Sequence, residues 1–96
     1  MLTITDAASQ WFRQELALPA TGSGIRFFGK VYGKTEVHDG FSVGMTRDDS
    51  LDDAVATTLK DGVTYYIAEP DAWFFDHLAM QVDVAHDEPA YHFSER

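Results

Sequence analysis

Residues Gly24 to Met45 read GIRFFGKVYGKTEVHDGFSVGM, and the predicted fold depends on the hydrophobic period of this stretch. Outward-facing and inward-facing side chains alternate from Ile25 to Tyr32, which is the period of two that is typical of a β-strand. Gly33 to Gly40 forms a loop bounded by glycines, and the alternation resumes from Phe41 to Met45. The stretch therefore predicts a strand, a loop and a second strand.

The segment before this stretch has the period of a helix. Thr5 or Asp6 is suited to cap the first free backbone N–H groups, and Leu18-Pro19 ends the helical pattern. Apolar residues recur at helical spacing and form one face, made of Ile4, Ala7, Ala8, Trp11, Phe12 and Leu16. We therefore expect an N-terminal helix that packs this face on the core.

The segment after this stretch predicts a hairpin. Ala54 to Lys60 is rich in β-branched residues, Asp61-Gly62 is a strong turn signal, and alternation follows from Val63 to Ala68. The acidic residues 48–53 before it lack the spacing of a calcium loop, so we interpret them as a solvated turn. A strand, a turn and a strand are expected here.

The C-terminal third predicts a short helix and two strands. Pro70 suits the first turn of a helix, because its missing N–H has no intrahelical partner there. Asp71 to Asp76 then forms a short helix or turn that presents Trp73 and Phe74 to the core. Apolar residues alternate at Met80, Val82 and Val84, which indicates a strand. Asp87-Glu88-Pro89 predicts a turn, and Tyr91 to Phe93 predicts a last short strand. This order predicts an α+β domain with mainly antiparallel or mixed sheets, because crossover helices between strands are lacking.

Composition restricts the classes of function. The chain has 96 residues, enough for one domain over 1–96, and a net charge of −9. This charge disfavours nucleic acid and anionic membranes as partners, and the apolar runs are too short to span a bilayer. Cysteine is absent, which excludes disulfides, a thiolate nucleophile and cysteine-ligated metal within the chain. We expect a cytoplasmic protein that does not bind the membrane.

The order of elements and several short motifs resemble the HesB-like domain of A-type iron–sulfur cluster carriers, the IscA family. Leu2 to Ala8 (LTITDAA) is similar to the opening of that family, and Gly24 to Phe27 (GIRF) is similar to its "GLRL". The Asp61-Gly62-Val63 turn and the Trp73-Phe74 helix parallel its later half. The resemblance covers nearly the whole chain and implies small β-sheets with flanking helices.

The sequence departs from this family at the residues that carry its chemistry. The family binds its cluster or iron through a cysteine in the loop after the second strand and a Cys-x-Cys near the C-terminus. The position of the loop cysteine falls at Lys34, and the C-terminal pair has no counterpart. The chain is therefore most similar to the cysteine-free YneR-like branch, and cluster assembly on its own thiolates is excluded.

Three of the four histidines are candidate metal ligands. His38 lies in the predicted loop beside Glu36 and Asp39, and His86 and His92 flank the last predicted turn. Imidazole and carboxylate together suit iron(II) or zinc, and pairing of the last two strands would bring the C-terminal histidines closer. The favoured interpretation is nevertheless that of exposed histidines in a polar loop and hairpin. We expect no cofactor, with iron or zinc as the alternative.

Arg26, Lys30 and Lys34 form the basic part of an acidic chain and are the candidate interaction residues. Gly24 to Lys34 carries no acid, whereas residues 35–96 carry 14 acids against 3 bases. This polarity suits the orientation of a partner protein, although ordinary sheet-surface chemistry explains it equally well. A weaker alternative is a small-ligand pocket of aromatic residues, lined by Phe27, Phe28, Tyr32 and Trp73.

The sequence as a whole favours a noncatalytic HesB-like protein that acts as an adaptor or interaction module. No serine lies in a nucleophile elbow, and no glycine-rich phosphate loop precedes a helix, so we do not expect an enzyme. The alternative is an iron(II)- or zinc-binding protein that uses His38, Asp39, His86 and His92. A protein partner is expected, with the chain itself a monomer or a weak homo-oligomer.

Overall fold

The predicted N-terminal helix is confirmed as α1 (Asp6–Glu15), and a short strand that we did not predict, β1 (Leu2–Ile4), precedes it. This computed structural model describes residues 2–31, 41–76 and 78–95. Thr5 caps α1, since its hydroxyl oxygen accepts the N–H of Ala8 at 3.1 Å. Ile4 therefore belongs to the strand and not to the apolar face of the helix, because the extended backbone of Thr5 separates the two elements.

The two predicted central strands and the following hairpin form one four-stranded sheet. It contains β2 (Ser23–Val31), β3 (Phe41–Arg47), β4 (Ala54–Lys60) and β5 (Val63–Ala68), in the order β3-β2-β5-β4. β2 pairs antiparallel with β3 and parallel with β5. The Asp61-Gly62 turn has positive φ values of 51° and 81°, as a two-residue hairpin turn requires. Both hairpin strands are thus confirmed.

The late helix is confirmed, but its orientation differs from the prediction. A 3₁₀ turn, η1 (Glu69–Asp71), holds Pro70 and leads into α2 (Ala72–Phe75). Phe74 and Phe75 are buried, whereas Trp73 is 57% exposed. The prediction that Trp73 faces the core is wrong, because one turn of helix buries only one side and the two phenylalanines occupy it.

The last two strands are longer than predicted. β6 (Leu78–Ala85) and β7 (Glu88–Glu95) pair antiparallel, and the turn between them is His86-Asp87, whose φ values are 54° and 61°. Asp87-Glu88-Pro89 is therefore not the turn. Pro89 lies inside an edge strand, where a missing N–H is tolerated. β1 pairs parallel with β6 on the other side, which gives a three-stranded sheet in the order β1-β6-β7.

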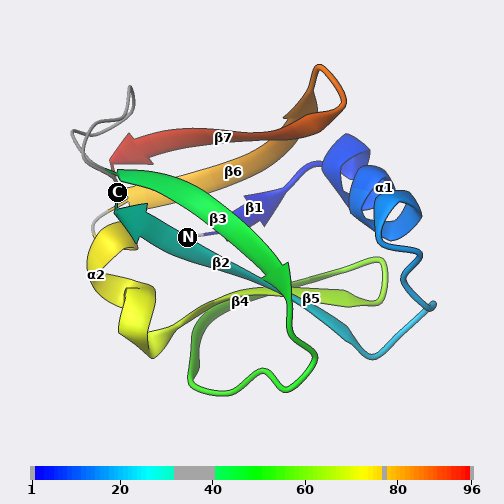
Figure 1. The fold of residues 1–96 in the computed structure, drawn as a ribbon, viewed down its shortest axis with the longest axis horizontal. Coiled ribbons are helices and arrows are strands. Elements are labelled where there is room, and N and C mark those ends of the chain that lie inside the picture. Colours follow the sequence, from blue (N-terminus) through cyan, green and yellow to red (C-terminus); the bar gives the residue numbers. More distant parts are fainter. Residues whose placement is uncertain (1, 32–40, 77, 96) are drawn as a thin grey trace.

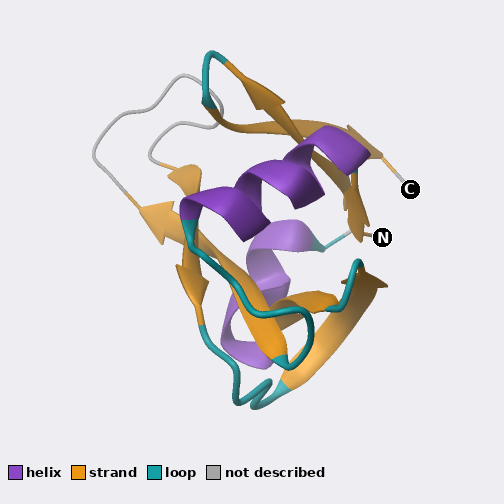
Figure 2. Ribbon diagram, turned by 90° about the vertical axis from the view of Figure 1, so that its right-hand side faces the viewer, coloured by secondary structure: helices purple, strands orange, loops and turns teal. Residues whose placement is uncertain are grey.

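The core lies between the two sheets and under α1. Rings from three elements meet there: Phe12 of α1 lies 6.2 Å from Phe27 of β2 and 5.7 Å from Tyr65 of β5, measured between centroids. All three side chains are fully buried. Figure 1 shows α1 and α2 at opposite ends of the molecule, and in Figure 2, which is turned by 90°, α1 lies in front of α2. Two mixed sheets with a long and a short helix confirm the α+β class.

Candidate functional site

The predicted metal ligands are not brought together in the described part of the chain. His38 and Asp39 lie outside the described residues. His86 lies in the turn of the last hairpin, and His92 pairs with Gln81 further along the ladder. Because Glu88 pairs with Ala85, the register separates the two histidines by roughly four residues of strand, or about 13 Å. Within 2–31, 41–76 and 78–95, no three His, Asp or Glu side chains form a group that holds a metal ion.

A polar group that connects the start of α1 with β6 consists of Thr5 and Asp83. The carboxylate of Asp83 accepts the backbone N–H of Val84 at 2.8 Å and the hydroxyl of Thr5 at 2.9 Å. These two hydrogen bonds lower the pKa of Asp83, and the charge of His92 adds a smaller effect in the same direction. The hydroxyl of Thr5 thus has two roles: it caps α1, and it donates a hydrogen bond to Asp83 of β6. This arrangement fixes α1 on the three-stranded sheet.

Arg26, the first candidate interaction residue, forms an intramolecular ion pair. Its guanidinium Nη2 lies 2.7 Å from a carboxylate oxygen of Asp71, and the side chain of Asp71 is only 13% exposed. A partner that bound Arg26 would have to compete with this contact. Lys34 lies outside the described residues, and only the backbone of Lys30 is described, in β2. The basic interaction face stays a prediction.

The acidic turn after β3 is a structural element and not only a solvated loop. The carboxylate of Asp49 accepts hydrogen bonds from the guanidinium of Arg47 and from the backbone N–H of Gly24. Both hydrogen bonds lower the pKa of Asp49. The backbone carbonyl of Asp48 accepts the hydroxyl of Tyr66, which is fully buried. The turn therefore covers one face of the four-stranded sheet.

Two of the aromatic residues that suggested a ligand pocket, Phe27 and Trp73, differ in their exposure. Phe27 is fully buried in the core, where its ring contacts Phe12, Tyr65 and Tyr91. Trp73 lies on the surface of α2. Tyr32 is outside the described residues. Phe27 and Trp73 have different environments, and the small-ligand pocket lined by Phe27, Phe28, Tyr32 and Trp73 stays a prediction.

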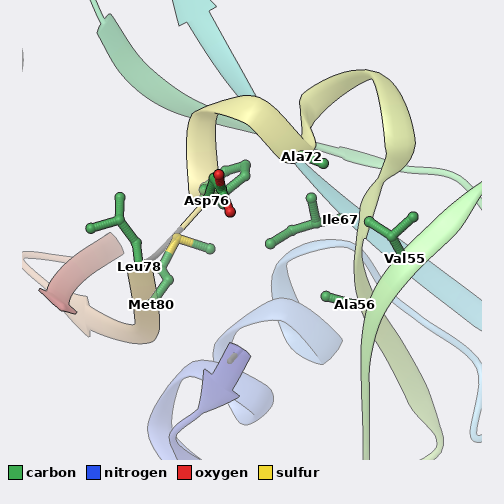
Figure 3. A pocket seen from close by; sticks show the side chains of 8 residues that line it. Val55, Ala56, Ile67, Ala72, Asp76, Leu78 and Met80 are labelled. Atoms are coloured by element: carbon green, nitrogen blue, oxygen red, sulfur yellow. The ribbon is translucent and has the colours of Figure 1, made fainter. Parts of the chain in front are cut away.

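A different surface, which we did not predict, has the features of a binding site. A hollow of about 170 Å³ opens between β4, α2 and β6, and we call it the α2 hollow. Figure 3 shows Val55 and Ala56 on one side, Leu78 and Met80 on the other, and the residues of α2 above them. Its described lining consists of Val55, Ala56, Ile67, Ala72, Phe75, Asp76, Leu78 and Met80.

Exposed apolar side chains of the edge strand β4 lie at and near this hollow. Val55 is 53% exposed and Leu59 is 73% exposed, although both are apolar and both belong to the edge strand β4. A β-bulge between Ala54 and Ala56 changes the register at Val55. Apolar residues at alternate positions of a strand normally face the core, so the pattern alone does not indicate that these two side chains are exposed. The position of β4 at a sheet edge is a tertiary property that the pattern does not contain.

Three comparisons place the chain among known proteins. No family model matches it. A pyruvate dehydrogenase inhibitor of Bacillus subtilis (strain 168) is 35% identical over 94 residues, which cover 96% of this chain and 97% of that protein. An uncharacterized protein of Staphylococcus aureus (strain MRSA252) is 33% identical over 93 residues, with 94% and 95% covered.

Two solved structures share the fold of this chain. SufA of Escherichia coli, involved in the biosynthesis of iron–sulfur clusters, has a TM-score of 0.60 and 21% identity over 98% of this chain and 79% of SufA. IscA, solved with a 2Fe–2S cluster, has a TM-score of 0.59 and 18% identity over 99% of this chain and 85% of IscA. The predicted HesB-like fold is confirmed, while the narrower YneR-like branch stays a prediction. No helix in the described ranges is long and apolar enough to cross a membrane.

Proposed function

Because the chain belongs to the family of the Bacillus subtilis pyruvate dehydrogenase inhibitor, we propose that it is a noncatalytic protein that binds a pyruvate dehydrogenase and lowers its activity. The observation that carries this proposal is the 35% identity over 97% of that relative. The similarity covers nearly the full length of both chains, so it concerns the same folded unit. A role as an adaptor for an enzyme complex is the broader form of the same proposal.

The absence of cysteine supports binding rather than cluster chemistry. SufA and IscA share the fold, but this chain has no thiolate with which to hold a cluster. Inhibition by binding needs no reactive group on the inhibitor. A protein that binds an inactive state more tightly than the active one shifts the enzyme toward the inactive state by that difference in affinity. The chain then contributes surface complementarity only.

The proposal is tested with the purified chain and a purified pyruvate dehydrogenase complex from the same organism. We expect pyruvate-dependent NAD reduction to fall as the chain is added and to level off once the binding sites are saturated, with a dissociation constant of about 1 µM or tighter. Calorimetry on the same samples gives the stoichiometry. Unchanged activity together with no heat of binding at this concentration would contradict the proposal. A heat-denatured sample of the chain is the control.

The alternative function, iron(II) or zinc binding through His38, Asp39, His86 and His92, has its own test. Anaerobic titration of the tag-free chain with each metal, followed by calorimetry, measures binding directly. A site made of histidines loses affinity as pH falls through the histidine range, and His38→Ala or His92→Ala abolishes it. If no heat is detected, metal binding is excluded for the chain alone, and the binding proposal is unaffected.

A further inference from the structure

A second hollow, of about 370 Å³, lies on the outer face of the three-stranded sheet, and we call it the sheet hollow. The register of the sheet places Thr3 of β1, Gln81 of β6 and His92 of β7 in one row across the three strands. In the next row Ala79 pairs with Ser94, and the small side chain of Ala79 leaves space above the sheet. All five residues line the sheet hollow.

The size of the sheet hollow suits a small molecule. Side chains directly opposite on paired strands have Cβ atoms about 5 Å apart, and residues two apart along one strand are separated by about 7 Å. The polar side chains of the two rows therefore surround an area of roughly 10 by 7 Å. The volume of about 370 Å³ lies within the range of small-ligand pockets, roughly 300–1,000 Å³.

The chemistry of the lining indicates a ligand with hydrogen-bond acceptors. The polar side chains of Thr3, Gln81, His92 and Ser94 are exposed, and within the described ranges no side-chain hydrogen bond or ion pair engages them. They supply two hydroxyls, a primary amide and an imidazole, each of which donates hydrogen bonds, and a protonated imidazole only donates. The described lining holds no Asp or Glu, although the chain has 16 of them. A cationic donor among neutral donors fits an anion.

The acid that faces His92 from the neighbouring strand does not occupy the hollow. Asp83 pairs with Ala90 in the row beyond His92, and the charges of Asp83 and His92 attract each other. Its carboxylate accepts the hydroxyl of Thr5 at 2.9 Å and the N–H of Val84 at 2.8 Å, which directs it toward the start of α1. The described part of β1, Leu2–Ile4, carries no charged side chain. The donors of the hollow are therefore open to a ligand.

We propose that the sheet hollow binds a small carboxylate, with the imidazolium of His92 and the amide of Gln81 as its main donors and the hydroxyls of Thr3 and Ser94 beside them. Hydrogen bonds from an ionised donor to a carboxylate are stronger than those between neutral groups. A phosphate dianion is a poorer occupant, because a chain of net charge −9 repels two charges more than one. This inference goes beyond the proposed function and does not depend on it, since the ligand binds the chain alone.

The experiment titrates the full chain with pyruvate at pH 6 and follows the backbone amides by two-dimensional NMR. Pyruvate is the probe because its carboxylate and keto oxygens are all acceptors. We expect a dissociation constant of about 1 mM, as suits a ligand of so few atoms in an open site, with the largest shifts at Thr3, Gln81, His92 and Ser94. Methyl pyruvate has nearly the same shape without the charge, and we expect it to bind about tenfold more weakly.

Two pairs of variants test the donors one at a time. Gln81→Glu places a negative charge in the hollow with little change of shape, and Gln10→Glu makes the same change at an exposed position of α1. We expect about tenfold weaker pyruvate binding for Gln81→Glu and little change for Gln10→Glu. His92→Asn removes the cation, and His86→Asn is its control in the hairpin turn, where asparagine tolerates the φ of 54°.

The dependence on pH separates a role of His92 in binding from a structural one. An imidazole loses its charge between about pH 5 and 8, whereas pyruvate stays ionised throughout. Affinity for pyruvate should therefore fall as pH is raised from about 6 to 8 in the wild type and in His86→Asn. It should be weak and independent of pH in His92→Asn. Circular dichroism verifies that each variant folds.

Each of several results would overturn the inference. No shift of any amide at about ten times the expected dissociation constant would show that the hollow takes no carboxylate. Shifts that cluster away from β1, β6 and β7 would place the binding elsewhere. Equal binding of methyl pyruvate would remove the charge from the argument, and tighter binding of inorganic phosphate would assign the site to another anion. None of these results touches the proposed inhibition, which is measured with the enzyme complex.

Discussion

The two helices close opposite ends of the same core, and they do so in different ways. α1 has ten residues, a side-chain cap at Thr5 and a fully buried Phe12. Side chains of α1 and of its cap make polar contacts with distant parts of the chain: Thr5 with Asp83, Asp6 with Lys60, Ser9 and Arg13 with Asp61, and Trp11 with Asp87. α2 has four residues, no side-chain cap hydrogen bond and an exposed tryptophan, and it borders the α2 hollow.

The comparison indicates that the α1 end contributes mainly to the stability of the fold and the α2 end mainly to partner binding. At the end of α1, a buried Phe12 and hydrogen bonds to Asp83, Asp61 and Asp87 hold the helix against the rest of the chain. The end at α2 leaves apolar surface open, which a monomer normally buries and an interface uses. We therefore expect substitutions at α1 to change the free energy of unfolding and substitutions on the surface of α2 to change partner binding.

The largest expected effect is that of Phe12→Ala. Removing a fully buried ring at the junction of α1 with both sheets lowers the free energy of unfolding by about 3–5 kcal/mol. Phe75→Ala is the matched substitution at α2, and its loss is smaller because the ring already borders open space. Urea unfolding of both variants measures the difference. Equal losses would contradict the contrast between the two ends.

Gly29→Ala tests how α2 is held on β2. An added Cβ would lie 2.6 Å from two ring atoms of Phe74, which is closer than real contacts allow. Overpacking of this kind destabilises by about 1–3 kcal/mol. Chemical denaturation measures the loss, and the double variant Gly29→Ala/Phe74→Leu is expected to recover part of it by removing the clashing ring. If the double variant is as unstable as the sum of both changes, the clash is not the cause.

Thr5→Ala removes the cap of α1 and the hydrogen bond to Asp83 at the same time. We expect a loss of about 1–2 kcal/mol, near the upper end for a single cap. Thr5→Ser keeps the hydroxyl and should retain most of the stability. Thermal unfolding of the two variants distinguishes the hydroxyl from the methyl group. A loss of the same size in Thr5→Ser would assign the effect to packing.

The ionisation of Tyr91 at alkaline pH tests how tightly the two sheets pack around its ring. Its ring lies 5.9 Å from that of Phe27, and burial raises its pKa to about 12. The pKa is higher in the folded chain than in the unfolded one, so this contribution to stability is complete below the unfolded value, roughly 10. It is lost as pH rises toward 12. Ultraviolet titration should show a step near 12, and Tyr91→Phe should reduce its amplitude by one tyrosine, because burial also raises the pKa of Tyr65 and Tyr66.

Much of the fold was predictable because local patterns determined it. Three predicted features depend only on neighbours in sequence: the helical period of α1, the Asp61-Gly62 turn and the alternation in β5. The structure confirms this helix, this turn and this strand. Strand β1 was missed because three residues carry too little pattern to be recognised without their partner β6. The α2 hollow was missed because it depends on side chains from four elements. Small residues such as Ala56 and Ala72 give no signal until those elements are packed together.

The smallest expected change in the free energy of unfolding is that of Trp73→Ala. The comparison with Trp11→Ala tests directly how the α1 and α2 ends differ. The indole N–H of Trp11 donates to Asp87 at 3.0 Å, and its ring packs edge-on to Phe12. Trp73 is 57% exposed and packs edge-on to Phe74. Trp73→Ala should therefore change the free energy of unfolding by less than about 1 kcal/mol, with a larger loss for Trp11→Ala. Urea unfolding measures both.

The inhibition assay should rank the two tryptophan variants in the opposite order. Trp11→Ala should still inhibit pyruvate dehydrogenase under conditions where it stays folded, because we expect partner binding at the α2 end. An exposed tryptophan is a residue on which interfaces often depend, so Trp73→Ala should inhibit less well although it is as stable as the wild type. If both variants inhibit like the wild type, α2 has no part in binding. The exposure of Trp73 is then only a consequence of a helix too short to bury three aromatic rings.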